Sequence, residues 1–168
     1  MADENGEAGQ GAQAQGAAAG QGADAPPLAV TVQYIKDLSF ENPRAPQSFG
    51  ELTQAPEINV DIDVEARQLQ QNVFEVTLQI NAKAEREGNL FFVVELAYGA
   101  VCVVGNVPPQ HIQPLVMIEG PRLMFPFARS ILADAVRDGG YPPLLINPID
   151  FARLYQRKAE QSKQDNSA

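Results

Sequence analysis

Residues 91–104 read FFVVELAYGAVCVV, the most apolar run of this 168-residue chain. The run is rich in β-branched and aromatic residues, so it predicts a long β-strand. Glu95 is its only charged residue. An isolated buried carboxylate would cost several kcal/mol or take up a proton. We therefore expect a sheet with one covered face and one face in water, and we expect Glu95 on the exposed face.

Three segments before this run alternate between apolar and polar residues, which is the pattern of half-buried strands. The alternation is nearly perfect over residues 57–65 and 73–84. Over residues 30–41 it breaks at Ile35 and Lys36, which indicates a bulge or a strand edge. The segment Arg86-Glu87-Gly88-Asn89 predicts a hairpin turn into the run that carries Glu95.

A long loop is expected between the first two strands, because residues 42–56 contain three prolines and Gly50. Loops of this length in compact domains are usually functional or disordered. Phe49 and Leu52 lie in this loop, so it carries apolar side chains that need a surface to pack against.

The pattern becomes helical after Gly105. We expect helices over residues 109–119 and 125–138, with Pro126 in a first turn because proline is disfavoured in a helix interior. A last helix is expected after Asn147, which can cap it, with Pro148 in the first helical position and Asp150 near the positive end of the helix dipole. Strands followed by helices predict an α+β fold, with a four-stranded antiparallel sheet and helices packed on one face.

Composition limits the function classes. The net charge is -9 and the isoelectric point is near 4.5. This argues against nucleic-acid binding, which depends on Lys and Arg. No run reaches the ~20 apolar residues of a membrane span, and residues 1–27 lack the features of a signal peptide. The single cysteine, Cys102, is expected to be a small core residue of a protein in a reducing compartment, so a cytoplasmic location is expected.

The sequence contains few of the residue patterns that enzymes use for catalysis. His111 is the only histidine, and no Cys/His cluster suggests a metal site. Neither a phosphate-binding glycine loop nor a G-x-S-x-G elbow is present. Asp61 and Asp63 are paired carboxylates on one strand face, but no apolar wall is expected to separate their pKa values. We therefore predict no enzymatic activity, no cofactor and no metal.

One acidic constellation remains. Asp37, Ser39 and Glu41 are spaced by two residues, so in an extended chain their side chains project from the same side. Between Asp37 and Glu65 there are seven acids and one arginine. Such a face suits a basic partner, because complementary charge speeds association and sets specificity. The alternative is an ordinary soluble sheet surface.

Four motifs in order resemble the SecB family of bacterial protein-export chaperones, over roughly residues 30–157. They are YIKDLSFENPRAP at residues 34–46, FVVE at residues 92–95 followed by Gly99, LMFPFAR at residues 123–129, and PLLINPIDF at residues 143–151 followed by Leu154 and Tyr155. We expect a SecB-like domain over residues 28–160, followed by a flexible C-terminal tail (residues 161–168). Residues 1–27 are Ala, Gly and Gln with scattered acids and no large apolar residue, so we expect a disordered low-complexity tail there.

The resemblance also implies a function. Its members are homotetramers, built as dimers of dimers, that hold unfolded precursor proteins without nucleotide and deliver them to the motor ATPase SecA. The basic, zinc-bearing C-terminal segment of SecA docks on the acidic sheet face. The residues that match this docking site are Asp37, Glu41, Val93 and Glu95. The residues that match positions of subunit packing are Val94, Leu96 and Tyr98.

Client binding in the family uses a long apolar groove beneath the loop between the first two strands, walled by the last helix. Phe49, Leu52 and Tyr155 are the candidates in this chain, with the alternative that they are ordinary core residues. Ala97 and Tyr98 depart from the family, where Gln and Gly are frequent. A general or antitoxin-associated chaperone on the same fold, with a different partner, is the rival function, and a small-molecule carrier or enzyme using the cleft between sheet and helices is a second rival.

Overall fold

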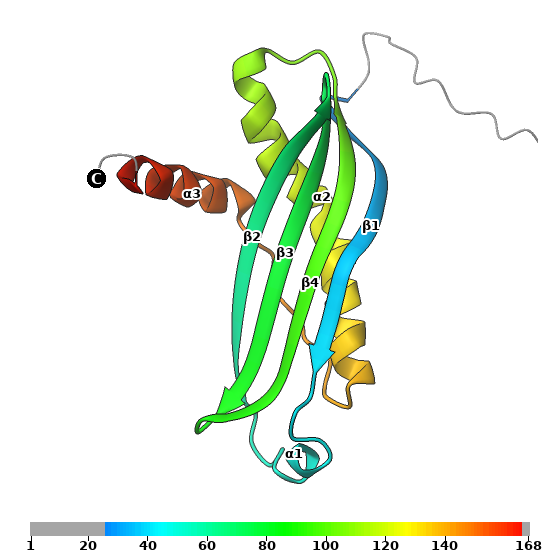
Figure 1. Cartoon of the computed structure of the whole chain (residues 1–168), viewed down its shortest axis with the longest axis vertical. Coiled ribbons are helices and arrows are strands. Elements are labelled where there is room, and N and C mark those ends of the chain that lie inside the picture. The colour runs from blue at the N-terminus through cyan, green and yellow to red at the C-terminus, as the bar shows by residue number, and fades with distance from the viewer. Residues whose placement is uncertain (1–25, 166–168) are drawn as a thin grey trace, which may run out of the picture.

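The computed structural model describes residues 26–165, so the expectation for the tail over residues 1–27 falls almost wholly outside the described residues. Four long strands form one antiparallel sheet in the order β1-β4-β3-β2. Their bounds are β1 Leu28–Glu41, β2 Glu57–Gln70, β3 Val73–Arg86 and β4 Asn89–Val104. The run that contains Glu95 is therefore a central strand, and β1 and β2 are the two edges (Figure 1).

The predicted hairpin is confirmed. Glu87 and Gly88 lie between β3 and β4 with φ angles of 52° and 78°. Positive φ at both central residues gives a two-residue turn whose twist matches that of the strands. The connection between β1 and β2 contains a short helix, α1 (Gln47–Gly50), at one end of the sheet (Figure 1).

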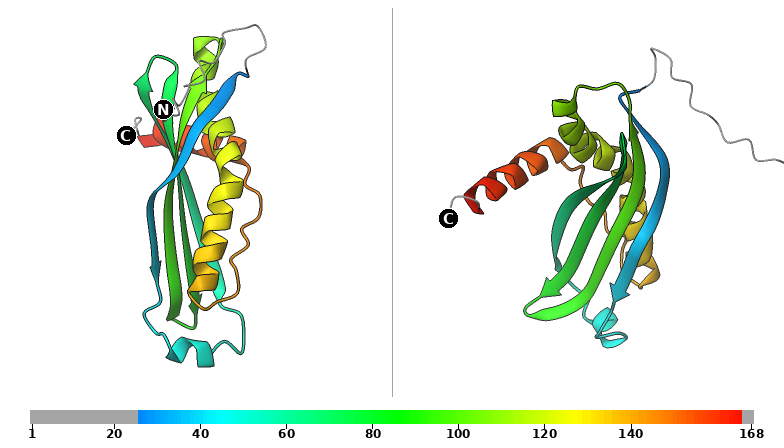
Figure 2. Two further views of the ribbon diagram at one scale, coloured as in Figure 1. Left: turned by 90° about the vertical axis from the view of Figure 1, so that its right-hand side faces the viewer. Right: turned by 45° about the horizontal axis from the view of Figure 1, so that its top comes forward.

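A single long helix, α2 (Pro109–Asp138), covers one face of the sheet (Figure 2). The expectation of two helices is wrong: α2 continues through Pro114, Pro121 and Pro126. Each proline removes one intrahelical hydrogen bond, but Ile112, Val116 and Leu132 pack against the core, so the helix is anchored before, between and after the prolines. A Cβ on Gly120 would lie 3.3 Å from a methyl group of Val76, so glycine lets α2 approach β3 closely.

The last helix, α3 (Phe151–Asp165), begins later than expected. The carboxylate of Asp150 accepts a hydrogen bond from the backbone N–H of Arg153 over 3.0 Å, so Asp150 is the capping residue. Asn147 and Pro148 precede the helix in an irregular segment. Helical structure also extends past residue 160, to Asp165.

The core lies between the sheet and α2. It contains the alternate residues of β3 and β4 that face the helix, including Val76, Leu78, Ile80, Val94, Leu96 and Cys102. Burial raises the pKa of the Cys102 thiol to about 11, which confirms the expectation of a small core residue. The predicted α+β architecture is confirmed, since the described helix α2 covers one sheet face and the acidic residues lie on the other.

Candidate functional site

The four predicted docking residues lie together on the outer face of the sheet, opposite α2. Residues that are directly paired in an antiparallel ladder share a face. Glu41 pairs with Val93, and Ser39 pairs with Glu95. Asp37 is two residues before Ser39, about 7 Å along the strand, and is therefore on the same face. We refer to Asp37, Glu41, Val93 and Glu95 as the acidic docking face.

The carboxylates of the acidic docking face are open to solvent. Asp37, Glu41 and Glu95 are exposed, and Val93 is half-buried between them. The hydroxyl of Ser39 donates a long hydrogen bond to Glu95 across the β1–β4 pair, over 3.4 Å. This arrangement fits a surface that meets a cationic group together with a small apolar one.

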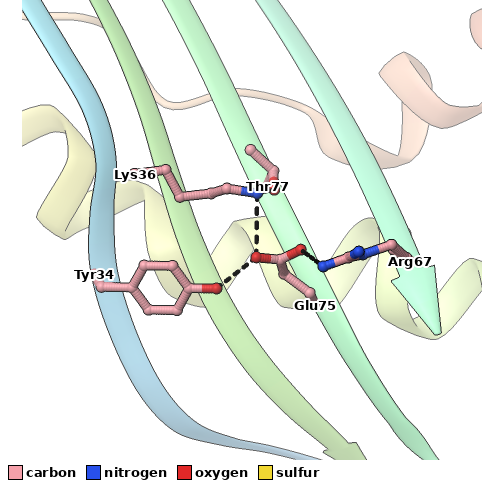
Figure 3. A network of polar contacts seen from close by, with 5 residues as sticks. All are labelled: Tyr34, Lys36, Arg67, Glu75 and Thr77. Carbon is pink, nitrogen blue, oxygen red and sulfur yellow. Dashed lines mark hydrogen bonds and ion pairs between the residues drawn. The ribbon is translucent and has the colours of Figure 1, made fainter. Parts of the chain in front are cut away.

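Glu75 of β3 is another carboxylate on the outer face, and it is buried, with only 9% of its surface exposed. The hydroxyl of Tyr34 donates to its Oε1 over 2.6 Å, and the ammonium of Lys36 lies 3.1 Å from the same oxygen. Arg67 pairs with its Oε2 over 3.0 Å (Figure 3). These hydrogen bonds, first that of Tyr34 and then that of Lys36, lower the pKa of Glu75 to about 2.

Glu75 makes the stability of the protein depend on pH. Its pKa is about 2 in the folded chain against an ordinary value of 4.5. Its stabilising contribution is therefore fully present above pH 4.5 and is lost as the pH falls toward 2. We expect Glu75→Gln to lower the free energy of unfolding by about 2 kcal/mol at pH 6, a figure reduced because Lys36 and Arg67 are partly exposed. Urea denaturation at pH 6, 4 and 3 should show the two proteins converging in acid; a pH-independent difference would contradict this account.

An apolar groove of about 370 Å³ lies at the α1 end of the molecule. Its walls come from the loop before β2, from β4 and from the segment after α2, and its lining is mainly apolar. It is lined by Leu52, Pro56, Ile58, Phe92, Tyr141, Pro143, Leu144 and Leu145, among others. Leu145 is 69% exposed, so an apolar side chain stands in solvent at the groove.

The loop candidates lie at or beside this groove. Leu52 lines it directly. The ring of Phe49 packs against Tyr141, one of the lining residues, with 5.3 Å between ring centroids. The segment Tyr141–Leu145 was missed in the sequence, although its two adjacent prolines indicate an extended chain that leaves side chains uncovered.

Tyr141 holds the groove together through its hydroxyl. The hydroxyl lies 2.9 Å from Ser48 Oγ, 2.9 Å from Asn42 Oδ1 and 3.1 Å from the carbonyl oxygen of Phe91. Its single proton can be donated to only one acceptor at a time, so Ser48 supplies a second proton to the cluster. The side chain of Ser48 is fully buried. The cluster joins α1, the end of β1, the start of β4 and the segment after α2.

Replacing Tyr141 by Phe should loosen this junction. The substitution keeps the ring packing but removes the donor to the carbonyl oxygen of Phe91, and it leaves Ser48 Oγ with only its long hydrogen bond to Asn42 Oδ1, over 3.5 Å. We expect the free energy of unfolding to fall by about 1–3 kcal/mol. We also expect faster protease cleavage within residues 42–56, because the loop loses one of its polar anchors and keeps mainly the hydrogen bonds from Arg86 to the carbonyl oxygens of Glu51 and Gln54. Unchanged urea denaturation and unchanged cleavage would show that the hydroxyl cluster does not hold the loop.

Tyr155 lies elsewhere. It is half-buried on α3, which projects beside β2 (Figure 1), and it does not line the apolar groove. The ammonium of Lys158 ties α3 to the edge strand, with 2.7 Å to Asp63 and 2.9 Å to the carbonyl oxygen of Val64. The structure therefore places Leu52 in the groove and Phe49 beside it, whereas Tyr155 lies on α3 and is not among the lining residues.

The predicted subunit-packing residues are core residues. Val94, Leu96 and Tyr98 face α2 and are 0%, 2% and 7% exposed. α2 covers this parity of β4, so these side chains are buried within the chain. Their part in subunit packing stays a prediction.

Among residues 26–165, no group of three or more His, Cys, Asp or Glu side chains could hold a metal ion. No helix in the same range is long and apolar enough to cross a membrane.

Comparison with known proteins supports one family. The family model described as preprotein translocase subunit SecB matches residues 21–162. A protein-export protein SecB of Bradyrhizobium diazoefficiens is 53% identical over 141 residues, which is 84% of this chain and 88% of that protein. One of Azorhizobium caulinodans is 55% identical over 134 residues, which is 80% of this chain and 84% of that protein.

A solved structure shows the same fold at low identity. A SecB-like chaperone of Mycobacterium tuberculosis, determined with a peptide from an antitoxin, superposes with a TM-score of 0.61. It is 11% identical, and the match covers 73% of this chain and 90% of that chain. With the match over residues 21–162 and relatives that are more than half identical, the chain belongs to the SecB family.

Proposed function

We propose that this chain is an ATP-independent holdase of the cytoplasm, which keeps precursor proteins unfolded for export. The observation that carries the proposal is the open apolar groove at the α1 end, where Leu52, Phe92 and Leu144 face a space of about 370 Å³. A groove with an apolar wall and few polar groups can accept many different unfolded segments, because it demands no particular side chain.

One groove of this size binds only a short segment, so holding requires several sites. An unfolded client touches several such sites in one assembly, and the combined avidity exceeds the affinity of any one contact. Release needs no chemistry under this scheme. Folding of the client competes with binding, so clients that fold slowly are held.

The assembly that we propose is a homotetramer, a dimer of dimers. Two observations support it. β1 is an edge strand with exposed apolar residues, Ile35 and Leu38, and α2 exposes Leu123 and Phe127, which are four residues apart on one side of the helix. Light scattering at micromolar concentration should give four times the chain mass of 18.2 kDa; a mass of one or two chains would count against the tetramer.

Handover to SecA is the second part of the proposal. The acidic docking face offers three exposed carboxylates to the basic, zinc-bearing C-terminal segment of SecA. The zinc belongs to the partner in this scheme. A chaperone whose client is an antitoxin would have the same fold. It would not need Asp37 and Glu41 to lie on one face with Glu95.

The holding function is tested with a denatured, slow-folding precursor diluted into buffer without nucleotide. We expect the chain to slow its refolding in proportion to the concentration of assembly, and to do so equally with and without ATP. Refolding at the rate seen with serum albumin in place of the chain would contradict the proposal.

A further inference from the structure

Lys36 is the extra residue in a bulge of β1. Before it, Tyr34 pairs with Gly99 and Ile35 pairs with Tyr98; after it, Asp37 pairs with Ala97. The register therefore shifts by one residue between Ile35 and Asp37. A bulge places two residues of one strand opposite one residue of its neighbour and leaves the extra residue unpaired.

The bulge decides which face the acids occupy. In an unbroken ladder Lys36 would pair with Ala97, Asp37 would pair with Leu96 and Leu38 would pair with Glu95. A shift of one residue exchanges the two faces of a strand. Asp37 and Glu41 would then project toward α2. The acidic docking face therefore exists only because the ladder is interrupted before Asp37.

Side chains on the outer face hold the bulged residue. The ammonium of Lys36 contacts Glu75 Oε1 at 3.1 Å and donates to the hydroxyl of Thr77 over 3.3 Å, so it reaches across β4 to β3 (Figure 3). Tyr34, two residues before the bulged residue, donates to the same Glu75 oxygen over 2.6 Å. Glu75 thus ties the bulged residue to the part of β1 that precedes the register shift.

Gly99 makes this crossing possible. A Cβ on Gly99 would lie 2.6 Å from Cε2 of Tyr34 and 3.1 Å from Cδ of Lys36. The aromatic ring and the lysine stem therefore cross β4 where that strand carries no side chain. At the other end of this stretch, Phe40 stacks on Phe92 with 5.7 Å between ring centroids. The Phe40 stack fixes the far end of the stretch, so without Lys36 the bulge could move along residues 36–39.

We propose that Lys36 and Glu75 are positioning residues for the acidic docking face. They hold the bulge at residue 36 and so keep Asp37 aligned with Glu95 for a cationic partner. The inference rests on the proposed docking of SecA, which it deepens by assigning residues that shape the surface from outside it.

The Lys36→Met variant distinguishes a positioning role of Lys36 from the effect of its charge alone. The substitution removes a cation and makes the outer face more negative, so a pure charge effect would strengthen binding of a basic segment. If Lys36 positions Asp37, the substitution should weaken binding instead. We expect about five- to tenfold lower affinity for a zinc-loaded peptide of the SecA C-terminal segment, because Asp37 no longer stays in register. Calorimetry on the full chain measures the affinity, and amide hydrogen exchange of residues 37–40 should become faster.

Lys83→Met is the matched control. Lys83 pairs with Val93 on the same face and forms an ion pair with Glu85 at 2.7 Å, so its loss changes the charge equally without touching the bulge. We expect the control to bind the peptide at least as tightly as the unchanged chain. Binding of Lys36→Met that is equal or tighter, with unchanged hydrogen exchange, would overturn the inference.

A separate variant, Glu95→Lys, tests whether the acidic docking face is the binding site at all. If Glu95→Lys binds the peptide as well as the unchanged chain, the acidic docking face is not the site, and the positioning role falls with it. If Glu95→Lys loses binding while Lys36→Met keeps it, only the positioning role is wrong. In both variants, retention of an unfolded precursor should remain normal, which shows that the fold is intact.

Discussion

Glu95→Lys is expected to lower the affinity for SecA by about a hundredfold while leaving retention of an unfolded precursor unchanged. Glu95 is exposed on β4, beside Ser39 and close to Val93. Reversing its charge removes one attraction and places a cation against a basic partner, and like charges at an interface cost several kcal/mol. The apolar groove has no lining residue in common with this face, so client binding should not follow the change.

Glu65→Lys is the control for this prediction. Glu65 is an exposed acid on β2 and pairs with Thr77, so it lies on the same face of the sheet, toward the other edge. The change in net charge is identical. We expect less than about a threefold loss of affinity, because exposed charges beyond about 10 Å are largely screened. Equal losses from both variants would show that SecA responds to total charge and not to the acidic docking face.

Phe92→Ala is expected to have the largest effect on stability. Phe92 is 3% exposed and lies between two rings, 5.7 Å from Phe40 and 5.0 Å from Tyr141 by ring centroids. Truncating a buried Phe removes its transfer free energy and leaves a cavity, which costs about 3–5 kcal/mol. Urea denaturation should show this loss. Capture of clients should also weaken, because Phe92 is a wall of the apolar groove.

Leu69→Ala is the comparison for the Phe92 variant. Leu69 is 44% exposed near the end of β2, away from the groove, and its truncation should change the free energy of unfolding by less than about 0.5 kcal/mol. If Phe92→Ala loses less than about 1 kcal/mol, the stacked arrangement of the three rings does not hold this end of the molecule together.

Much of the fold could be predicted because each strand is long and alternates. The break at Ile35 and Lys36 even located the bulge. The helices were harder to predict. The sequence places Pro126 at a helix start, yet α2 runs through three prolines because residues before and after them pack against the core. Asp150 rather than Asn147 caps α3, and two suitable capping residues so close in sequence cannot be ranked without the tertiary structure.

Which side chains share a face of the sheet could be predicted from the alternation along each strand. Which of them are buried by neighbouring side chains could not. Asp37, Glu41, Val93 and Glu95 share a face because the register brings them together. The alternation over residues 73–84 places Glu75 on the outer face, but its burial beneath Tyr34 depends on contacts between strands that lie far apart in the sequence. Val94, Leu96 and Tyr98 have the opposite parity to Glu95, and they lie on the covered face beneath α2, as alternation predicts.

Co-sedimentation of the chain with an unfolded precursor, with and without SecA, tests the central claim most directly. We expect the precursor to sediment with the chain in the absence of nucleotide, and we expect added SecA to join this complex through the acidic docking face. A precursor that sediments alone would contradict the holding function. A complex that forms but never includes SecA would contradict the handover and leave this chain as a chaperone for another partner.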